Sequence, residues 1–321
     1  MVPEHALVER FRRDLDALIA ADARIGVAVS GGSDSLALLL LAAAARPGGI
    51  EAASVDHSFR PESRGEAEMV AGVCESLGVP HQILTVGWHD PPATAIQERA
   101  RKERYRLLGF WAEERGIQAL VTAHHADDQA ETFLMRLSRG SGVRGLSGMR
   151  PRSIAPGTEI RLVRPLLGWR RTDLEGICAA ADLTPAIDPS NADCRFERVR
   201  VRNALGTSEL PDADAIARSA AHLRDADAAL DWSARAEWSR IVHERHGTIA
   251  FRPGDLPGEI LRRMVSRAVR KLGTEGEANL RGPELDRLLA TLVEDGTATL
   301  RGVLCSGGAE WRFARAPARR D

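Results

Sequence analysis

A glycine-rich loop between two apolar stretches constrains the fold of this chain most. Residues 24–29 include β-branched side chains and are typical of a strand that is buried on both faces. The sequence S-G-G-S-D-S follows at 30–35, and a helix is expected over 33–45. Two glycines let the backbone turn tightly, so that successive N–H groups can face one concavity at the start of the helix. The loop is therefore expected to bind phosphate.

Strands and helices alternate along the first two thirds of the chain. Strands are predicted at 50–55, 82–86, 119–122 and 160–163, and helices at 4–20, 62–77, 94–116, 126–138, 174–181 and 198–205. This alternation predicts an α/β, Rossmann-like fold with a parallel sheet, whose ligands bind beyond the carboxyl ends of the strands. Asp56-His57 and His124-His125 each follow a predicted strand, so they are expected at the same edge as the loop.

A change in composition near Pro211 indicates a second domain. The boundary is expected within 206–212, which gives a catalytic domain over 1–208 and a smaller, mainly helical domain over 209–321. In the second domain, helices are predicted at 213–241, 258–272 and 283–292, and short strands within 297–313.

The side chains of the loop suggest its ligands. The expected phosphate contacts are Ser30, Gly31, Gly32, Ser33 and Ser35. Asp34 would repel a phosphate, but it suits Mg²⁺ that bridges phosphates. The loop lacks the lysine and spacing of a Walker A motif, and it lacks G-x-G-x-x-G. The alternative is a plain glycine turn with serine and aspartate helix caps.

Two arginines of the predicted helix at 94–116 are candidates for stabilising charge. Arg101 and Arg104 are three residues apart, so they project from one face of the helix. There they could reach an α-phosphate and stabilise the charge of its transition state. The alternative is that they pair with Glu98 and Glu103 on a solvated face.

An acidic cluster follows the paired histidines. Asp128 and Glu131 are three residues apart and share a helix face, where two carboxylates would hold an ammonium group well. The alternative is that acidic residues favour the first turn of any helix. His124 and His125 are metal-ligand types, but no third ligand at suitable spacing appears, so contact with a nucleotide or a structural role is preferred.

Arginines are concentrated in the middle of a chain whose formal net charge is −1. Residues 136–171 hold nine arginines and one acid, Glu159, and further arginines follow at 195–202. Such a field can attract nucleic-acid phosphates while the whole molecule stays neutral. The expected RNA contacts are Arg139, Arg144, Arg164, Arg198 and Arg202.

The remaining composition restricts the chain's surroundings. The four cysteines form no C-x-x-C pair, so reduced thiols are expected in place of a zinc or iron–sulfur site. No apolar run is long enough to span a bilayer, and the charged N-terminus differs from a signal peptide. A cytoplasmic protein without membrane contact is expected, and dimerisation is left open.

The ordered motifs give a family resemblance. The loop resembles that of the pyrophosphate-loop ATP hydrolases, which have an adenine-nucleotide α-hydrolase-like fold. Six further segments, in order, are similar to those of the tRNA(Ile)-lysidine synthases: V-D-H-S-F-R at 55–60, A-R-x-x-R-Y at 100–105, T-A-H-H-x-x-D-Q-x-E-T at 122–132, R-G-S-G at 139–142 with R-P-L-L at 164–167, D-x-S-N-x-D at 188–193, and R-x-x-x-R at 198–202. Phe59 and Val199 stand where the family usually has leucine and asparagine.

The resemblance implies a ligase that uses ATP and Mg²⁺. Its substrates would be free L-lysine and the wobble cytidine of the isoleucine tRNA with a CAU anticodon, whose codon changes from AUG to AUA. The C2 oxygen would attack the α-phosphate of ATP and release pyrophosphate, and the lysine amine would then displace AMP. Residues 209–321 would help to bind tRNA.

The resemblance also assigns roles to the candidate residues. Asp34 would hold Mg²⁺, Asp56 and His124 would contact ATP, and Asp128 with Glu131 would bind lysine, with Asp128 also taking a proton from the amine. Arg101 and Arg104 would serve catalysis. Two alternatives remain: a tRNA 2-thiolase, which needs catalytic cysteines that are not suitably spaced here, and a non-catalytic RNA-binding protein.

Overall fold

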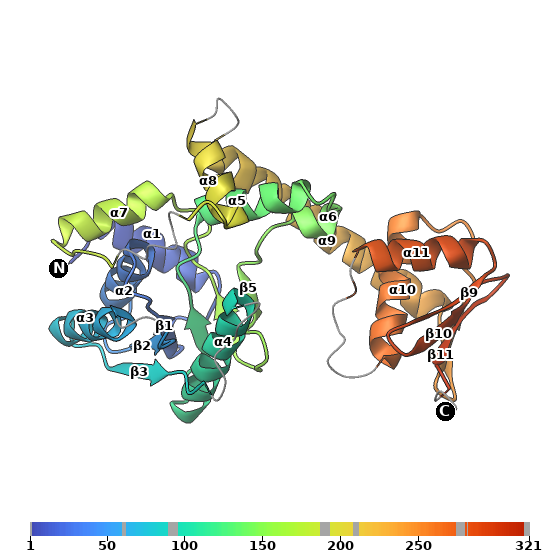
Figure 1. The fold of residues 1–321 in the computed structure, drawn as a ribbon, viewed down its shortest axis with the longest axis horizontal. Helices are drawn as coiled ribbons and strands as arrows, with labels where there is room; N and C mark the ends of the chain where they lie inside the picture. The colour runs from blue at the N-terminus through green and yellow to red at the C-terminus, as the bar shows by residue number, and fades with distance from the viewer. Residues whose placement is uncertain are drawn as a thin grey trace. The chain divides into compact units, whose positions relative to one another are not determined.

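The computed structural model describes residues 2–59, 62–88, 96–186, 193–207, 212–273, 280 and 282–317. Arg60 and the Asp188–Asn191 part of one motif therefore lie outside the described residues. The chain forms two compact units, Met1–Gly140 with Gly145–Ala221, and Ser141–Arg144 with His222–Asp321 (Figure 1). This division lies inside one helix, α9 (Ala213–Ile241). The functional division at 208/209 stays a prediction.

The first unit is built on a six-stranded sheet in the order β3-β2-β1-β4-β6-β5. The strands are β1 (Ile25–Ala28), β2 (Ile50–Asp56), β3 (His81–Thr85), β4 (Ala119–Val121), β5 (Arg152–Ile154) and β6 (Arg161–Val163). All neighbours are parallel except β5 and β6, which form an antiparallel edge. The predicted α/β, Rossmann-like fold is confirmed.

The helices up to residue 207 are α1 (His5–Asp16), α2 (Ser33–Ala45), α3 (Glu62–Ser76), α4 (Ile96–Glu114), α5 (Ala126–Leu137), α6 (Val143–Leu146), α7 (Arg171–Ala180) and α8 (Glu197–Thr207). Of these, α2, α3 and α4 pack against the strands of the sheet, and α5 packs with α8. The leucine and alanine run of α2 is almost wholly buried, because α1 and α7 pack on it while it lies against β1. Among the described helices, none has the length and apolar content needed to cross a membrane.

The opposite face of the sheet packs against α4 through Trp111, which is 1% exposed. This packing requires a glycine in the central strand. A Cβ on Gly26 would lie 2.7 Å from a ring carbon of Trp111, closer than any real contact. The glycine therefore lets the indole lie directly on β1 and sets the distance between α4 and the sheet.

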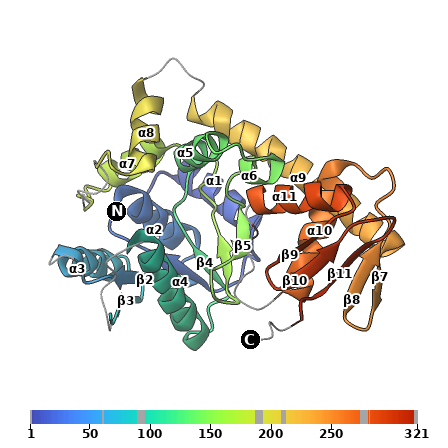
Figure 2. The same cartoon turned by 45° about the vertical axis from the view of Figure 1, so that its right-hand side comes forward.

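The second unit contains part of α9, with α10 (Gly258–Leu272) and α11 (Gly282–Val293) packed on a five-stranded antiparallel sheet (Figure 2). Its order is β7-β8-β11-β10-β9, from β7 (His243–Arg245), β8 (Thr248–Phe251), β9 (Thr297–Leu300), β10 (Val303–Ser306) and β11 (Trp311–Arg315). The predicted helical C-terminal region and the strands within 297–313 are confirmed. The β7–β8 hairpin was not predicted.

A buried ion cluster also stabilises the second unit. The Arg263 side chain is 4% exposed, and its guanidinium contacts Asp227 at 2.7 Å, Asp231 at 2.5 Å and Glu259 at 2.8 Å. Such a buried arginine is tolerated because several carboxylates surround it. This cluster joins α9 to α10 within the unit.

Candidate active site

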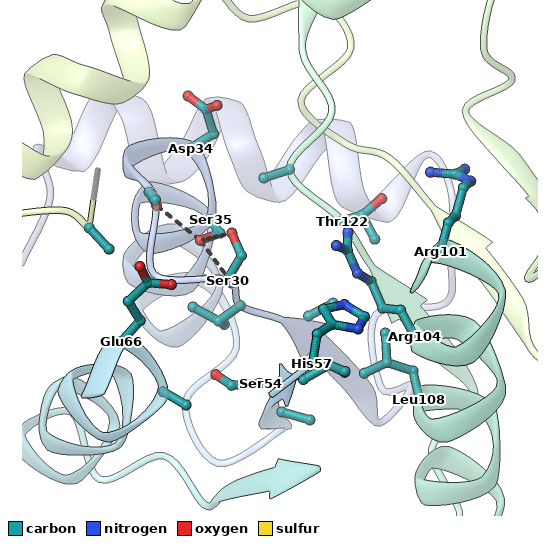
Figure 3. Close-up of a pocket in the computed structure, with 18 of the residues that line it drawn as sticks. Ser30, Asp34, Ser35, Ser54, His57, Glu66, Arg101, Arg104, Leu108 and Thr122 are labelled. Atoms are coloured by element: carbon teal, nitrogen blue, oxygen red, sulfur yellow. Dashed lines mark hydrogen bonds between the residues drawn. The ribbon is translucent and has the colours of Figure 1, made fainter. Parts of the chain in front are cut away.

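A cavity of about 470 Å³ opens at the carboxyl ends of β1, β2 and β4, where the sequence predicted the ligand site (Figure 3). The loop after β1 forms one wall, the end of β2 forms the floor, and α4 forms the facing wall. Lining residues include Ser30, Gly32, Asp34, Ser35, Ser54, His57, Arg101, Arg104, Thr122, His124, Asp128 and Arg198. The volume is typical of small-molecule sites.

The loop at 30–35 closes on itself through one hydroxyl. The Ser35 hydroxyl accepts a hydrogen bond from the Ser30 N–H at 3.1 Å and donates one to the Gly32 carbonyl at 2.9 Å. Gly31 has φ +88°, a left-handed conformation that favours glycine. Because α2 begins at Ser33, its first N–H groups have no partner inside the helix and can bind an anion.

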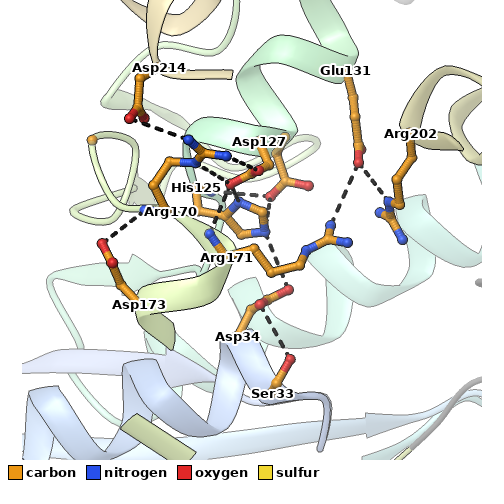
Figure 4. A network of polar contacts seen from close by, with 12 residues as sticks. Ser33, Asp34, His125, Asp127, Glu131, Arg170, Arg171, Asp173, Arg202 and Asp214 are labelled. Atoms are coloured by element: carbon orange, nitrogen blue, oxygen red, sulfur yellow. Dashed lines mark hydrogen bonds and ion pairs between the residues drawn. The ribbon is translucent and has the colours of Figure 1, made fainter. Parts of the chain in front are cut away.

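His125 lies buried beneath the loop between three carboxylates (Figure 4). Its Nε2 is 3.4 Å from Asp34 Oδ2 and 3.5 Å from Asp128 Oδ2, and its Nδ1 is 3.4 Å from Asp127 Oδ2. Burial lowers the pKa of His125, but the carboxylates outweigh it and raise that pKa to about 9. The imidazolium therefore holds Asp34 and Asp128 together, their Oδ2 atoms being at most 6.9 Å apart.

The sequence reading missed this role of His125, although the signal was available. Acids at 127 and 128 follow a histidine that caps a helix, and Asp127 also accepts a hydrogen bond from the Arg171 N–H at 2.8 Å. Burial raises the pKa of Asp127, but the hydrogen bonds with His125 and with that N–H outweigh burial, so the pKa is lowered overall. What the sequence could not give was the contact with Asp34, which lies 91 residues earlier.

Asp34 is the candidate metal ligand of the loop. Its side chain is 33% exposed and lines the cavity. Within the described part of the chain, no three acidic, histidine or cysteine side chains are grouped to hold a metal by themselves. Mg²⁺ commonly binds through one or two carboxylates together with substrate phosphates. The donor set therefore fits Mg²⁺ that arrives with a nucleotide.

Arg101 and Arg104 face the loop across the cavity. No carboxylate of the described residues forms an ion pair with either arginine; Glu103 instead contacts Arg106 at 2.6 Å. The alternative pairing with Glu98 and Glu103 is therefore not found. Partial desolvation, with Arg101 nearby, lowers the pKa of Arg104, which remains a cation at neutral pH.

Two histidines on the cavity wall are neutral. Burial and the charge of Arg104 lower the pKa of His57 to about 4. Burial lowers the pKa of His124 to about 4, and its Nδ1 lies 3.0 Å from the Thr122 hydroxyl. Asp56, in contrast, is turned from the cavity: its carboxylate accepts hydrogen bonds from the Ser58 N–H at 2.8 Å and the Ser63 hydroxyl at 2.5 Å. Those hydrogen bonds outweigh burial and lower its pKa.

The predicted lysine site is occupied by arginines of α8. Arg198 contacts Asp128 at 2.8 Å and Glu131 at 2.5 Å, and Arg202 contacts Glu131 at 2.7 Å. Glu131 is 1% exposed and also lies 3.6 Å from Arg171 (Figure 4). Burial raises the pKa of Asp128, but His125 and Arg198 outweigh it and lower that pKa. The carboxylates predicted to bind lysine are thus paired with the arginines predicted to bind tRNA.

The other arginines of the predicted RNA surface also have partners. Arg139 pairs with Glu197 and Arg144 with Asp231. Arg164 is 7% exposed and donates to the Arg150 carbonyl at 2.7 Å and the Ser153 hydroxyl at 3.1 Å. Its guanidinium is therefore buried and bonded within the first unit, and its contact with RNA stays a prediction.

Comparisons with known proteins identify the family of this chain. A model of the PP-loop domain family matches residues 6–209. The tRNA(Ile)-lysidine synthase of Novosphingobium aromaticivorans is 48% identical over 315 residues, which cover 97% of this chain and 94% of that protein. The tRNA(Ile)-lysidine synthase of Zymomonas mobilis is 43% identical over 300 residues, with 92% and 90% covered.

A solved structure shares the fold. The U34-tRNA thiolase NcsA from Methanococcus maripaludis superposes with a TM-score of 0.57 at 16% identity, covering 69% of this chain and 81% of that chain. At this identity the likeness concerns the fold alone.

Proposed function

The chain belongs to the PP-loop family and, within it, to the tRNA(Ile)-lysidine synthases, and from this premise we propose how its cavity divides the reaction among its residues. The enzyme is an ATP-using ligase that forms a carbon–nitrogen bond. The C2 oxygen of the wobble cytidine in the CAU anticodon attacks the α-phosphate of ATP, and pyrophosphate leaves. An amine of free lysine then attacks C2 and displaces AMP.

One observation carries this proposal: Arg101 and Arg104, which form no ion pair with a described carboxylate, face the loop at 30–35 across the cavity. The N–H groups at the start of α2 bind the departing pyrophosphate. Arg101 and Arg104 reach the α-phosphate from the facing wall and stabilise the charge that develops there. Because no carboxylate of the described residues neutralises them, their full charge is available to the nucleotide.

Asp34 holds Mg²⁺ that arrives with ATP. When bound, the metal neutralises phosphate charge. His125 fixes Asp34 from behind at 3.4 Å, so the carboxylate faces the cavity without reorganisation. His124, neutral on the same wall, can exchange a hydrogen bond with the nucleotide, whereas Asp56 supports the start of α3 and acts on ATP indirectly.

Asp128 binds the ammonium group of lysine. Its lowered pKa makes it a better partner for a cation than an acceptor of its proton, so charge binding is the stronger part of its assigned role. Glu131 holds α8 through Arg198 and Arg202, and lysine reaches it when an arginine withdraws. Arginines released in this way, with Arg139 and Arg144, bind tRNA phosphates in the cytoplasm.

A 2-thiolase is disfavoured by the state of the thiols. Burial raises the pKa of Cys74 and Cys305 to about 12 and that of Cys178 to about 11, so these thiols stay protonated. A catalytic cysteine needs a thiolate. Cys194 is the exposed cysteine, and no second thiol is spaced with it as a C-x-x-C pair.

Pyrophosphate release and nucleoside mass spectrometry test the function. The enzyme is incubated with ATP, labelled lysine and tRNA carrying a CAU anticodon. We expect lysine-dependent incorporation at the wobble cytidine, with one pyrophosphate released per product. No ATP turnover with any tRNA would contradict the proposal.

The Asp34→Asn variant tests the metal role separately. It should lose pyrophosphate release by at least about 100-fold, with a changed dependence on Mg²⁺ concentration. Asp22→Asn serves as the control because Asp22 is an exposed carboxylate that does not line the cavity. An Asp34→Asn variant with unchanged Mg²⁺ dependence would refute the role.

A further inference from the structure

Three aromatic rings stack at one side of the cavity. The Phe59 ring lies 5.9 Å from the His57 ring at an interplanar angle of 7°, and 5.1 Å from the Trp88 ring at 22°. The Trp88 indole N–H donates to the His57 carbonyl at 2.8 Å, which fixes Trp88 to the end of β2. The rings therefore form an ordered stack anchored to the sheet.

Phe59 is an exposed member of this stack. It is 41% exposed and lines the cavity, and among the described lining residues it is the large apolar side chain that stays open to solvent. Near-parallel rings with centres more than 5 Å apart are offset, so each neighbour covers part of the phenyl face. The cavity thus presents a partly open aromatic surface to whatever enters it.

The neighbours of this surface determine which ligand suits it. His57 is neutral, and both of its ring nitrogens are buried with no hydrogen-bond partner among the described residues, so the stack carries no charge that would attract an ion. Arg104 lies on the facing wall and is suited to phosphate. A flat heteroaromatic ring attached to a phosphate matches both surfaces, and bases of every kind stack on aromatic side chains.

We propose that Phe59, supported by His57 and Trp88, is a stacking platform for a nucleobase in this cavity. The inference rests on the proposed function, which brings two such rings to the site: the adenine of ATP and the target cytosine of the tRNA. It also gives a role to a phenylalanine where the resemblance leads one to expect leucine.

Phe59→Leu and Phe59→Trp test the platform. Leucine keeps an apolar side chain but removes the aromatic face, whereas tryptophan retains it. Phe59→Leu should raise the KM for either ATP or tRNA about tenfold, leave the KM for lysine unchanged, and be rescued by Phe59→Trp. The substrate whose KM changes identifies the stacked base.

Phe110→Leu is the matched control, because Phe110 is 59% exposed on α4 and does not line the cavity. Unfolding midpoints of all variants should match the wild type. Equal KM values for ATP and tRNA in the wild type and Phe59→Leu would overturn the platform, as would equal changes in Phe110→Leu.

A binding measurement separates this inference from the reaction itself. The fluorescence of 2-aminopurine riboside triphosphate, or of tRNA with a fluorescent cytosine analogue at the wobble position, should be quenched by the wild type and less by Phe59→Leu. This readout needs no turnover. Failure of the wild type to make product would count against the proposed function, whereas equal quenching by both proteins would count against the platform alone.

Discussion

Arg101 and Arg104 of α4 and Arg198 of α8 line the same cavity, but the arginines of the two helices differ in their ion pairing. Arg101 and Arg104 on α4 have no ion pair with any described carboxylate, whereas Arg198 and Arg202 on α8 contact Asp128 and Glu131. A guanidinium without an ion pair can bind an anion without first giving up a carboxylate, although Arg101 also lies 5.0 Å from the centre of the Tyr105 ring. A paired one must first exchange its partner. In the proposed function, the first two arginines are assigned to ATP, and the second two hold α8 until another substrate arrives.

Removing an unpaired arginine should reduce catalysis without weakening the fold. We expect Arg104→Ala to lower kcat for pyrophosphate release by about 10²- to 10³-fold, as for loss of a preorganised donor, and to leave the urea unfolding midpoint unchanged. Arg106→Ala is the matched control on the same helix, because Arg106 contacts Glu103 on an exposed face. A comparable loss of activity in the control would remove the distinction.

Removing the carboxylate that pairs with the α8 arginines should, in contrast, weaken the fold. Glu131→Gln removes a buried carboxylate charge from three nearby guanidinium groups, of which Arg198 keeps its second partner, Asp128. The free energy of unfolding should fall by about 3 kcal/mol, measured by urea denaturation. Glu103→Gln, at a single exposed pair, should change it by less than about 1 kcal/mol. Equal stability in the two variants would contradict the comparison.

Arg198 tests whether the pairing competes with lysine. Arg198→Met removes the guanidinium from Asp128 while Arg202 still neutralises Glu131. If lysine must displace Arg198, the KM for lysine should fall about tenfold, an effect of roughly 1.4 kcal/mol, with the KM for ATP unchanged. A higher KM for lysine would instead mean that Arg198 itself holds the amino acid.

The smallest expected effect is a pH dependence of stability, and it follows from the position of His57 near Arg104. The pKa of His57 is about 4 in the fold, below its ordinary 6.5, so between these values the unfolded chain binds more protons. Stability should therefore fall as pH drops from 6.5 towards 4. The shift corresponds to about 2 kcal/mol at pH 5 for a fully buried group, and about 1 kcal/mol is expected because His57 is only half-buried and solvent screens it. Urea midpoints at pH 7.5 and 5 should differ less in His57→Gln than in the wild type. An equal difference would show that Arg104 and burial do not act on His57.

The helices that the sequence predicted best carry different apolar signals: α2 is a continuous apolar run, whereas the apolar residues of α10 recur with strong helical periodicity. The predicted bounds of the helices at 33–45, 213–241 and 258–272 agree with α2, α9 and α10. β5 was missed because its residues are exposed or half-buried at the sheet edge and carry no apolar run. The β7–β8 hairpin has one local sequence signal, Gly247, that was overlooked. In the structure His246 and Gly247 both have positive φ, the conformation of a two-residue turn.

The sequence predicted which kinds of side chain lie near the cavity, but not which of them contact each other. Local spacing correctly placed Arg101 and Arg104 on one face, and the loop after β1 lies at the cavity. Partners distant in the sequence could not be read from it: Glu131 meets Arg198 across 67 residues. An excess of arginine in one segment says little about free charge when the neutralising acids come from other helices.

The contact between Gly26 and Trp111 also restricts how this protein can change. A side chain at position 26 is sterically incompatible with the indole, and a smaller residue at 111 alone would leave a cavity against β1. Each single step is penalised, whereas a simultaneous exchange can preserve volume. In a library of variants, substitutions at positions 26 and 111 should therefore be accepted in combination and seldom one at a time.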